Sequence, residues 1–243
     1  SDRDTYSALL NSLIIAIGTT FISTLFGVFF AWLVARTDLP FKKFMKIMFL
    51  VPFMLPSFIG ALAWKILLSP NAGYINRLLV RMFNLSASPI DIMTMGGIIA
   101  IESMYLFPFV FLQVTSALER MDPTLEESAR ISGAGLFTIT TKITLPLVLP
   151  SILAGALLVA LYSLAHFGVP AILGTEKGIY NIPTKIYERI YASAGSFSAI
   201  RIGTILSTIL VISAAIILKA QSMLLKRGKF QIIAGKSMRP VVL

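Results

Sequence analysis

Few residues of this sequence could take part in chemistry, and most of them stand alone. There is one histidine and no cysteine, which excludes thiolate metal sites and disulfide bonds. A nucleophilic triad needs a histidine, a nucleophile and an acid brought together by the fold, and His166 lies in an apolar stretch. No Gly-rich phosphate-binding loop of the Walker type is present. The sequence therefore predicts a non-catalytic protein with no catalytic residue, no metal ligands and no nucleotide hydrolysis of its own.

One acid, Glu102, lies within a long apolar run, in "GIIAIESMYLFPF". An ionisable side chain in such a run is costly and usually faces the interior of a helix bundle or a polar path. We take Glu102, Tyr105, Ser57 and His166 as candidates for lining a translocation path. Two alternatives stay open: Glu102 is a polar contact between helices or lies near the interface, and His166 is a packed, hydrogen-bonded histidine.

The most polar passage between two apolar runs is "LEESARISGAGLFTITTKITLPLV", residues 125–148. Asp122 can cap a helix whose first turn holds two glutamates, where negative charge is favoured. Gly133 suits the end of that helix, and a second short helix is expected from Leu136. A polar loop with this much defined structure predicts a docking surface.

The elements around this loop are predicted to be membrane helices. Of the 243 residues, 56% are hydrophobic and 13% charged, about half the charge of a soluble domain. A bilayer span needs about 20 apolar residues, and five runs are long enough, so the fold class is an all-α membrane bundle. The spans are expected at 9–35, 44–68, 92–118, 147–174 and 199–225.

The distribution of basic residues predicts the orientation. Thirteen of the 21 Lys and Arg lie in the loops 36–46 and 119–146 and in or just before the C-terminal tail. This predicts that these segments and the C-terminus are cytoplasmic and that the N-terminus is outside. Residues 1–226 would form the membrane domain and 227–243 a basic tail or linker. Because the basic residues follow membrane topology, no nucleic-acid partner is expected.

Other features predict an irregular, closely packed bundle. Prolines in three spans predict kinks, and recurring small residues such as Gly27 and Gly155 predict close helix contacts. Amphipathic stretches at 75–83 and 182–191 predict surface helices that either dock an external partner or anchor in the membrane interface. The prolines are Pro52, Pro56, Pro108, Pro150 and Pro170.

The loop also resembles a known signature. It reads E-S-A, three residues, G, nine residues, I-T-L-P, which is similar to the E-A-A-x3-G-x9-I-x-L-P motif of permease subunits of binding-protein-dependent ABC importers with the type I fold. Six matches at fixed spacing have a chance probability on the order of 10⁻⁷ per position, and Ser128 is the one departure. The matching residues are Glu127, Ala129, Gly133, Ile143, Leu145 and Pro146.

The resemblance implies a function and its partners. An extracytoplasmic solute-binding protein would deliver the substrate, a second permease half (homologous, fused or separate) would complete the path, and two ABC ATPase subunits would bind ATP and Mg, with no cofactor bound by this chain. The loop would be the coupling helix, in which Glu127 contacts the ATPase, Gly133 sets the bend and the last three residues anchor the fourth span. The residues implied in coupling are Glu126, Glu127, Ser128, Ala129, Gly133, Ala134, Gly135, Ile143, Leu145 and Pro146.

Two further stretches, "VPFMLPSFIGALAWKILLSPNAGYIN" and "FGVPAILG…IPTKIYERI", resemble the ferric-iron branch of that family, and "KFQIIAGKSMRP" resembles the linker of fused permeases. The resemblance therefore implies iron(III) transport across a prokaryotic inner (plasma) membrane. Thiamine, polyamine, phosphonate, sulfate and sugar phosphate remain alternative substrates. An ion-coupled secondary transporter is the alternative class.

Overall fold

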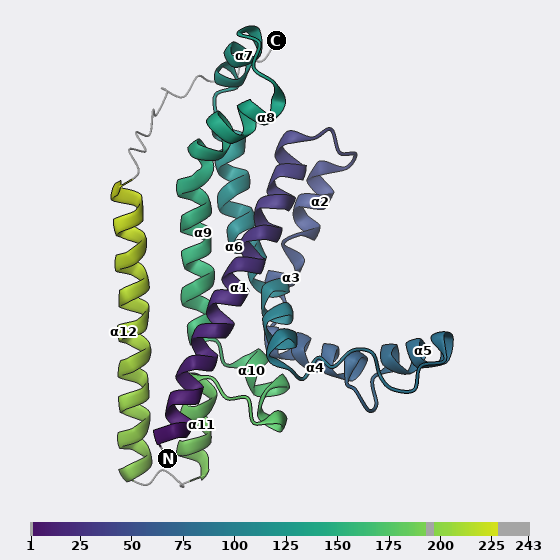
Figure 1. The fold of residues 1–243 in the computed structure, drawn as a ribbon, viewed down its shortest axis with the longest axis vertical. Coiled ribbons are helices and arrows are strands. Elements are labelled where there is room, and N and C mark those ends of the chain that lie inside the picture. The colour runs from purple at the N-terminus through teal and green to yellow at the C-terminus, as the bar shows by residue number, and fades with distance from the viewer. Residues whose placement is uncertain (1, 193–196, 228–243) are drawn as a thin grey trace.

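The computed structural model describes residues 2–192 and 197–227, and these form helices and connections without a strand (Figure 1). Two short turns interrupt the α-helices, a π-helical one at Thr140–Thr144 and a 3₁₀ one at Thr175–Lys177. The helices are α1 (Asp2–Arg36), α2 (Lys42–Met48), α3 (Val51–Met54), α4 (Ser57–Leu68), α5 (Tyr74–Phe83), α6 (Met95–Arg120), α7 (Thr124–Ile131), α8 (Leu136–Ile139), α9 (Leu145–Ala165), α10 (Gly168–Leu173), α11 (Ile182–Ala192) and α12 (Phe197–Arg227).

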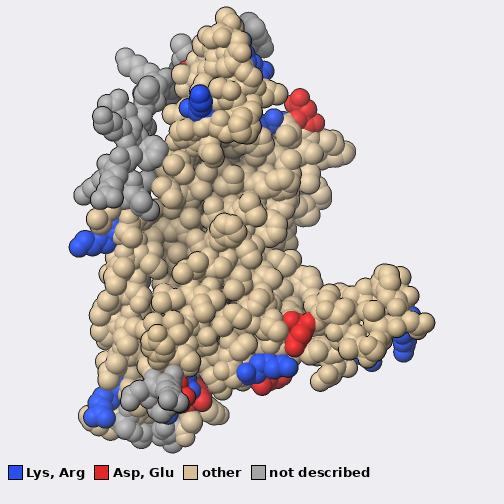
Figure 2. All heavy atoms as spheres, viewed as in Figure 1, with Lys and Arg blue, Asp and Glu red and all other residues tan. Residues whose placement is uncertain are grey.

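Four helical runs in the described residues are long and apolar enough to cross a membrane: α1, α6, α12 and the run Leu136–Ala165. A fifth span is possible if the bent pair Lys42–Met54 and Ser57–Leu68 counts as one. Figure 2 shows that the charged side chains on the visible face lie mostly near the two ends of the bundle and on the α4–α5 arm. The all-α membrane bundle predicted from the sequence is confirmed.

Two of the predicted spans are broken, which corrects the sequence prediction. The segment 44–68 is not one kinked helix, because its two parts meet at 92°. Pro52 lies at the start of α3 and Pro56 caps α4, where a missing backbone N–H costs little, so each proline begins a new helix. The span expected at 147–174 ends at Ala165, because His166 is extended (ψ 126°) and α10 is a separate helix.

Close contacts among α1, α6 and α9 form the core of the bundle. A Cβ built on Gly27 of α1 would lie 2.6 Å from Val110 Cβ, and one built on Gly155 of α9 would lie 2.7 Å from Val110 Cα. Both helices can therefore approach α6 at Val110 only because each has glycine there. Phe111, beside it, is fully buried. The predicted packing role of these small residues is confirmed.

The bundle has two distinct ends (Figure 1). The loop end holds α7 and α8, with α2 beside them and the C-terminal end of α12 on the same side; the far end holds the start of α1 together with α5, α10 and α11. The surface helices predicted at 75–83 and 182–191 are present as α5 and α11. Residues 228–243, most of the predicted tail, lie outside the described residues.

Candidate functional site

The loop between α6 and α9 has a defined turn at its centre. Thr124 N–H donates to Asp122 Oδ1 over 2.9 Å at the start of α7, and this bond holds the pKa of Asp122 below its ordinary value. Gly133 has φ +82°, a left-handed conformation that glycine adopts without strain. Its N–H and that of Ala134 donate back to Arg130 O and Ala129 O at 2.9 and 3.0 Å, which satisfies carbonyls at the helix end. The expected helix, glycine and second helix are all present. With Asp122 as its cap the first helix was expected to begin at Pro123, and α7 begins at Thr124.

The two neighbouring glutamates of α7 lie in different surroundings. Glu126 points inward, where its Oε1 accepts a hydrogen bond from Thr144 Oγ1 at 2.6 Å and pairs with Arg36 Nη2 at 3.2 Å. Glu127 is exposed. Glu126 therefore ties the loop to the ends of α1 and α9, while Glu127 is presented outward.

Large apolar side chains are exposed beside Glu127. Ile131, Leu136 and Phe137 are 88%, 70% and 81% exposed, and Leu125 is exposed too. We call these four residues the loop-end patch. Exposed apolar side chains on so polar a loop indicate an interaction surface. Of the other predicted loop residues, Ser128 and Gly135 are exposed, Ala129, Ala134 and Ile143 are half-buried, and Leu145 and Pro146 are exposed at the start of α9.

No break separates the second half of the loop from the fourth span. Helix α8 passes through the π-helical turn Thr140–Thr144 directly into α9. Such turns are frequent at functional sites. A force on α8 therefore reaches α9 through continuous helix.

A second group of polar residues lies buried in the bundle. Glu102 is fully buried. Its Oε2 accepts hydrogen bonds from Thr19 Oγ1 (3.1 Å) and Ser163 Oγ (2.6 Å), and its Oε1 lies 2.8 Å from His166 Nδ1. The other ring nitrogen, Nε2, lies 2.8 Å from Ser57 Oγ. Ser57, His166 and Glu102 thus form a continuous hydrogen-bonded chain, which we call the polar relay.

The relay joins three of the four path residues predicted from the sequence. Tyr105 is not part of it: its hydroxyl packs against Gly60, where a Cβ would lie 1.5 Å away. Sequence reasoning missed Thr19 and Ser163. Ser163 stands only three residues before His166, in the last turn of α9, whereas nothing distinguishes Thr19 from other hydroxyls in the first span.

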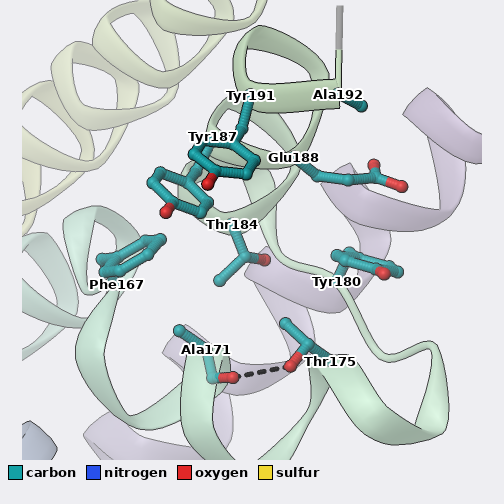
Figure 3. Close-up of a pocket in the computed structure, with 9 residues that line it drawn as sticks. All are labelled: Phe167, Ala171, Thr175, Tyr180, Thr184, Tyr187, Glu188, Tyr191 and Ala192. Carbon is teal, nitrogen blue, oxygen red and sulfur yellow. Dashed lines mark hydrogen bonds between the residues drawn. The ribbon is translucent and has the colours of Figure 1, made fainter.

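Two hollows lie at this side of the bundle, and Ser57 and His166 of the relay line one of them. The inner hollow, about 390 Å³, is lined by Ser57, His166, Phe58, Tyr162 and Phe167 among others. The outer hollow, about 330 Å³, shares Phe167 and Ala171 with it and lies between α10 and α11. Figure 3 shows Phe167, Tyr187 and Tyr191 gathered on one side of the outer hollow and Tyr180 and Glu188 on the other.

Comparison with known proteins decides the family. A model described as "Binding-protein-dependent transport system inner membrane component" matches residues 23–227. The chain belongs to this family. It is therefore a multi-pass membrane component of a transport system and not an enzyme, as the sequence predicted.

Curated relatives share this assignment. The spermidine/putrescine transport system permease protein PotB of Escherichia coli is 33% identical over 175 residues, covering 72% of this chain and 63% of PotB. The molybdenum transport system permease protein ModB of Escherichia coli is 29% identical over 214 residues, covering 87% of this chain and 91% of ModB. The chain thus spans less than two thirds of the polyamine permeases that it matches.

Solved structures confirm the fold. A bacterial ABC transporter involved in alginate import matches with a TM-score of 0.76 at 18% identity, covering 92% of this chain and 79% of that one. The MetNI methionine ABC transporter in an inward-facing conformation matches with a TM-score of 0.67 at 18% identity, covering 90% and 93%. The bundle has the type I ABC importer permease fold, as the sequence resemblance implied.

Proposed function

We propose that this chain is a permease half of an ATP-driven importer and that the loop end couples it to ABC ATPase subunits. The observation that carries the proposal is the α7–α8 loop, which presents Glu127 and the loop-end patch together at one end of the bundle. A cleft of a soluble ATPase offers both a polar partner for the carboxylate and apolar cover for the patch. In this proposal two ATPase subunits carry ATP and Mg, and a second permease half completes the path.

The loop is also built to transmit force. Glu126 fastens α7 to Arg36 of α1 and to Thr144 at the base of α9, and α8 continues into α9. Movement of the ATPase subunits would then be passed to two core helices as near-rigid bodies, which is how type I importers are expected to alternate access. We place the loop end in the cytoplasm and the far end outside, where the binding protein docks.

The substrate part of the proposal takes the relatives into account. PotB is named for spermidine and putrescine and ModB for molybdenum, so a small charged solute is the class that both support. Among the substrates considered from the sequence, polyamine gains support from PotB. Iron(III) stays a prediction of the sequence resemblance alone.

Reconstitution of the complex tests the coupling role. Purified ATPase subunits, binding protein and permease are assembled in liposomes, and ATP-dependent uptake is measured for Glu127→Lys and Gly133→Trp. We expect both variants to insert and fold but to lose uptake, because one reverses the exposed charge and the other cannot adopt φ +82° in the turn. Glu119→Gln, which removes an exposed carboxylate paired with Lys46, is the matched control and should keep uptake. Normal uptake by both loop variants would overturn the coupling role.

The polar relay supports one other candidate, an ion-coupled transporter, because buried acid–histidine pairs occur in proton pathways. The same liposomes separate the two. Uptake that needs ATP and the ATPase subunits supports the importer. Uptake that continues without them and collapses with the proton gradient supports the ion-coupled transporter.

A further inference from the structure

The α4–α5 arm leaves the side of the bundle and is held in shape by one buried side chain. Figure 1 shows the arm running across the direction of the long helices, with α5 at its outer end. Asn76 is fully buried, and its Nδ2 donates to the carbonyls of Leu68 (3.0 Å) and Ile90 (2.7 Å). Its Oδ1 accepts from the N–H of Ile90 at 3.2 Å. These bonds fasten the end of α4, helix α5 and the returning chain together, so the protein itself sets the orientation of α5.

Charged side chains at the base of the arm indicate its level in the membrane. Lys65, near the end of α4, forms an ion pair with Glu176, and Lys177 pairs with Asp91 at 3.6 Å. Both pairs are partly exposed, and Figure 2 shows acidic and basic side chains together at this place. Because charged groups avoid the hydrocarbon interior, the base of the arm lies where hydrocarbon meets water. Helix α5 extends from there along the interface.

Helix α5 carries two different rows of side chains on its exposed surface. Tyr74, Leu78 and Met82 follow one another at four-residue spacing and are 63%, 56% and 68% exposed. Successive residues are about 100° apart around a helix, so Arg77 and Arg81 form a neighbouring row. The Arg77 guanidinium lies 5.1 Å from the centre of the Tyr74 ring. An apolar row beside a basic one is typical of helices that lie in the membrane interface, where tyrosine is also enriched.

The charge of the arm has one sign. Residues 57–90 contain Lys65, Arg77 and Arg81 but no Asp or Glu. Lys65 is neutralised by Glu176. Arg77 donates to a backbone carbonyl at 2.9 Å, and within the described part of the chain neither arginine pairs with a carboxylate. The positive charge of α5 is therefore available to an anion, and guanidinium groups match the oxygens of phosphate.

We propose that α5 is an interfacial anchor that binds acidic phospholipid in the leaflet at the far end of the bundle. Leu78 and Met82 enter the acyl chains, and Arg77 and Arg81 bind the headgroup phosphates. A phospholipid surface matches both rows at once, because it changes from anionic to apolar over the depth of about 5–10 Å to which such helices are buried. The anchor holds the outer end of α4 at a fixed depth. It goes beyond the proposed importer function and requires only that the chain spans a membrane.

The absence of cysteine from the sequence allows a depth measurement. Met82→Cys is labelled with a fluorophore in the full chain, which is reconstituted in liposomes alone and then with its partner subunits. The label is quenched in turn by a nitroxide on the upper acyl chain of a lipid and by iodide on both sides of the membrane. We expect strong quenching by the lipid nitroxide, with or without partners. Iodide should quench it severalfold less than a label at Ile131→Cys, an 88% exposed position in the loop-end patch, when no ATPase is present.

Two results would overturn the anchor. One is quenching of Met82→Cys by iodide as strong as that of Ile131→Cys. The other is a Met82→Cys label that a binding protein or a second permease half shields from the lipid nitroxide, because α5 would then be a protein-docking helix.

Variants test the headgroup site. The lipid nitroxide is carried by phosphatidylglycerol or by phosphatidylcholine in liposomes that contain both lipids. Met82→Cys should be quenched about fivefold or more efficiently by the phosphatidylglycerol carrier. Adding Arg77→Gln and Arg81→Gln together should make the two carriers equal, while continued quenching by phosphatidylcholine shows that the arm is still in place. Arg120→Gln, an exposed arginine at the other end of the bundle, is the matched control and should keep the preference. No preference without the substitutions, or an unchanged preference with both, would overturn the phosphate contacts.

Discussion

Glu126 and Glu127 are adjacent in the sequence, yet the structure gives them opposite roles. Glu126 bonds to Arg36 and Thr144 inside the protein, and Glu127 faces outward. The resemblance implied both as coupling residues, and both stand in the first turn of the same helix. Only the contacts of Glu126 with Arg36 and Thr144 separate them.

We therefore expect Glu126→Gln and Glu127→Gln to differ. Glu126→Gln weakens two charge-assisted contacts of a largely buried group, worth about 1–3 kcal/mol locally. Hydrogen exchange of the amides in α7 (Thr124–Ile131) should become faster by about tenfold or more. Glu127→Gln should leave exchange unchanged and reduce ATPase binding. Equal exchange in the two variants would remove the anchoring role of Glu126.

The residues of the polar relay were individually predictable and their arrangement was not. Glu102 and His166 stand out because ionisable groups are rare in membrane spans. Their joining depends on the gap at His166 and the bend before Ser57, which bring together residues 64 and 109 positions apart. No local pattern encodes such long-range pairing.

At the scale of elements, the packing of α1 and α9 on α6 depends on two glycines facing Val110. Gly27→Ala and Gly155→Ala each place a Cβ under 3 Å from α6 atoms, including backbone, which should cost about 1–3 kcal/mol. The melting temperature of the purified protein should fall by several degrees. Gly96→Ala is the control, because its Cβ would meet only Thr94 Oγ1 at 3.9 Å and alanine favours helix. A Tm unchanged in the two core variants would contradict the close packing.

Spans were predictable as elements because hydrophobic length alone defines them. Their breaks were not, since a proline inside an apolar run can either kink one helix or begin another. Pro108 lies within the continuous helix α6, whereas Pro56 separates α3 from α4. Tertiary contacts distinguish the two prolines. The Tyr105 hydroxyl packs against Gly60 of α4, and the Ser57–His166 hydrogen bond lies at the start of that helix.

At the scale of the whole molecule, the two ends are specialised. The loop end carries the exposed loop-end patch and Glu127, and the far end carries α5, α11 and the outer hollow (Figure 1). The polar relay lies between them, where the broken spans meet. We propose that the ATPase binds at the loop end and the binding protein at the far end.

This division predicts that the purified chain hydrolyses no ATP alone and that its ATPase partner binds one end only. Turnover should be seen when the ATPase subunits are added and should rise with the loaded binding protein. Robust hydrolysis by the purified chain would contradict the separation of permease and motor.

Cysteine cross-linking tests the central claim most directly, because the sequence contains no cysteine. Phe137→Cys at the loop end and Tyr191→Cys at the far end place single thiols at positions of matched exposure, 81% and 78%. In the assembled complex, a thiol-attached photo-cross-linker should join the Phe137→Cys chain to the ATPase subunit and should not join the Tyr191→Cys chain to it. Cross-linking of the ATPase to Tyr191→Cys, with none to Phe137→Cys, would contradict the account.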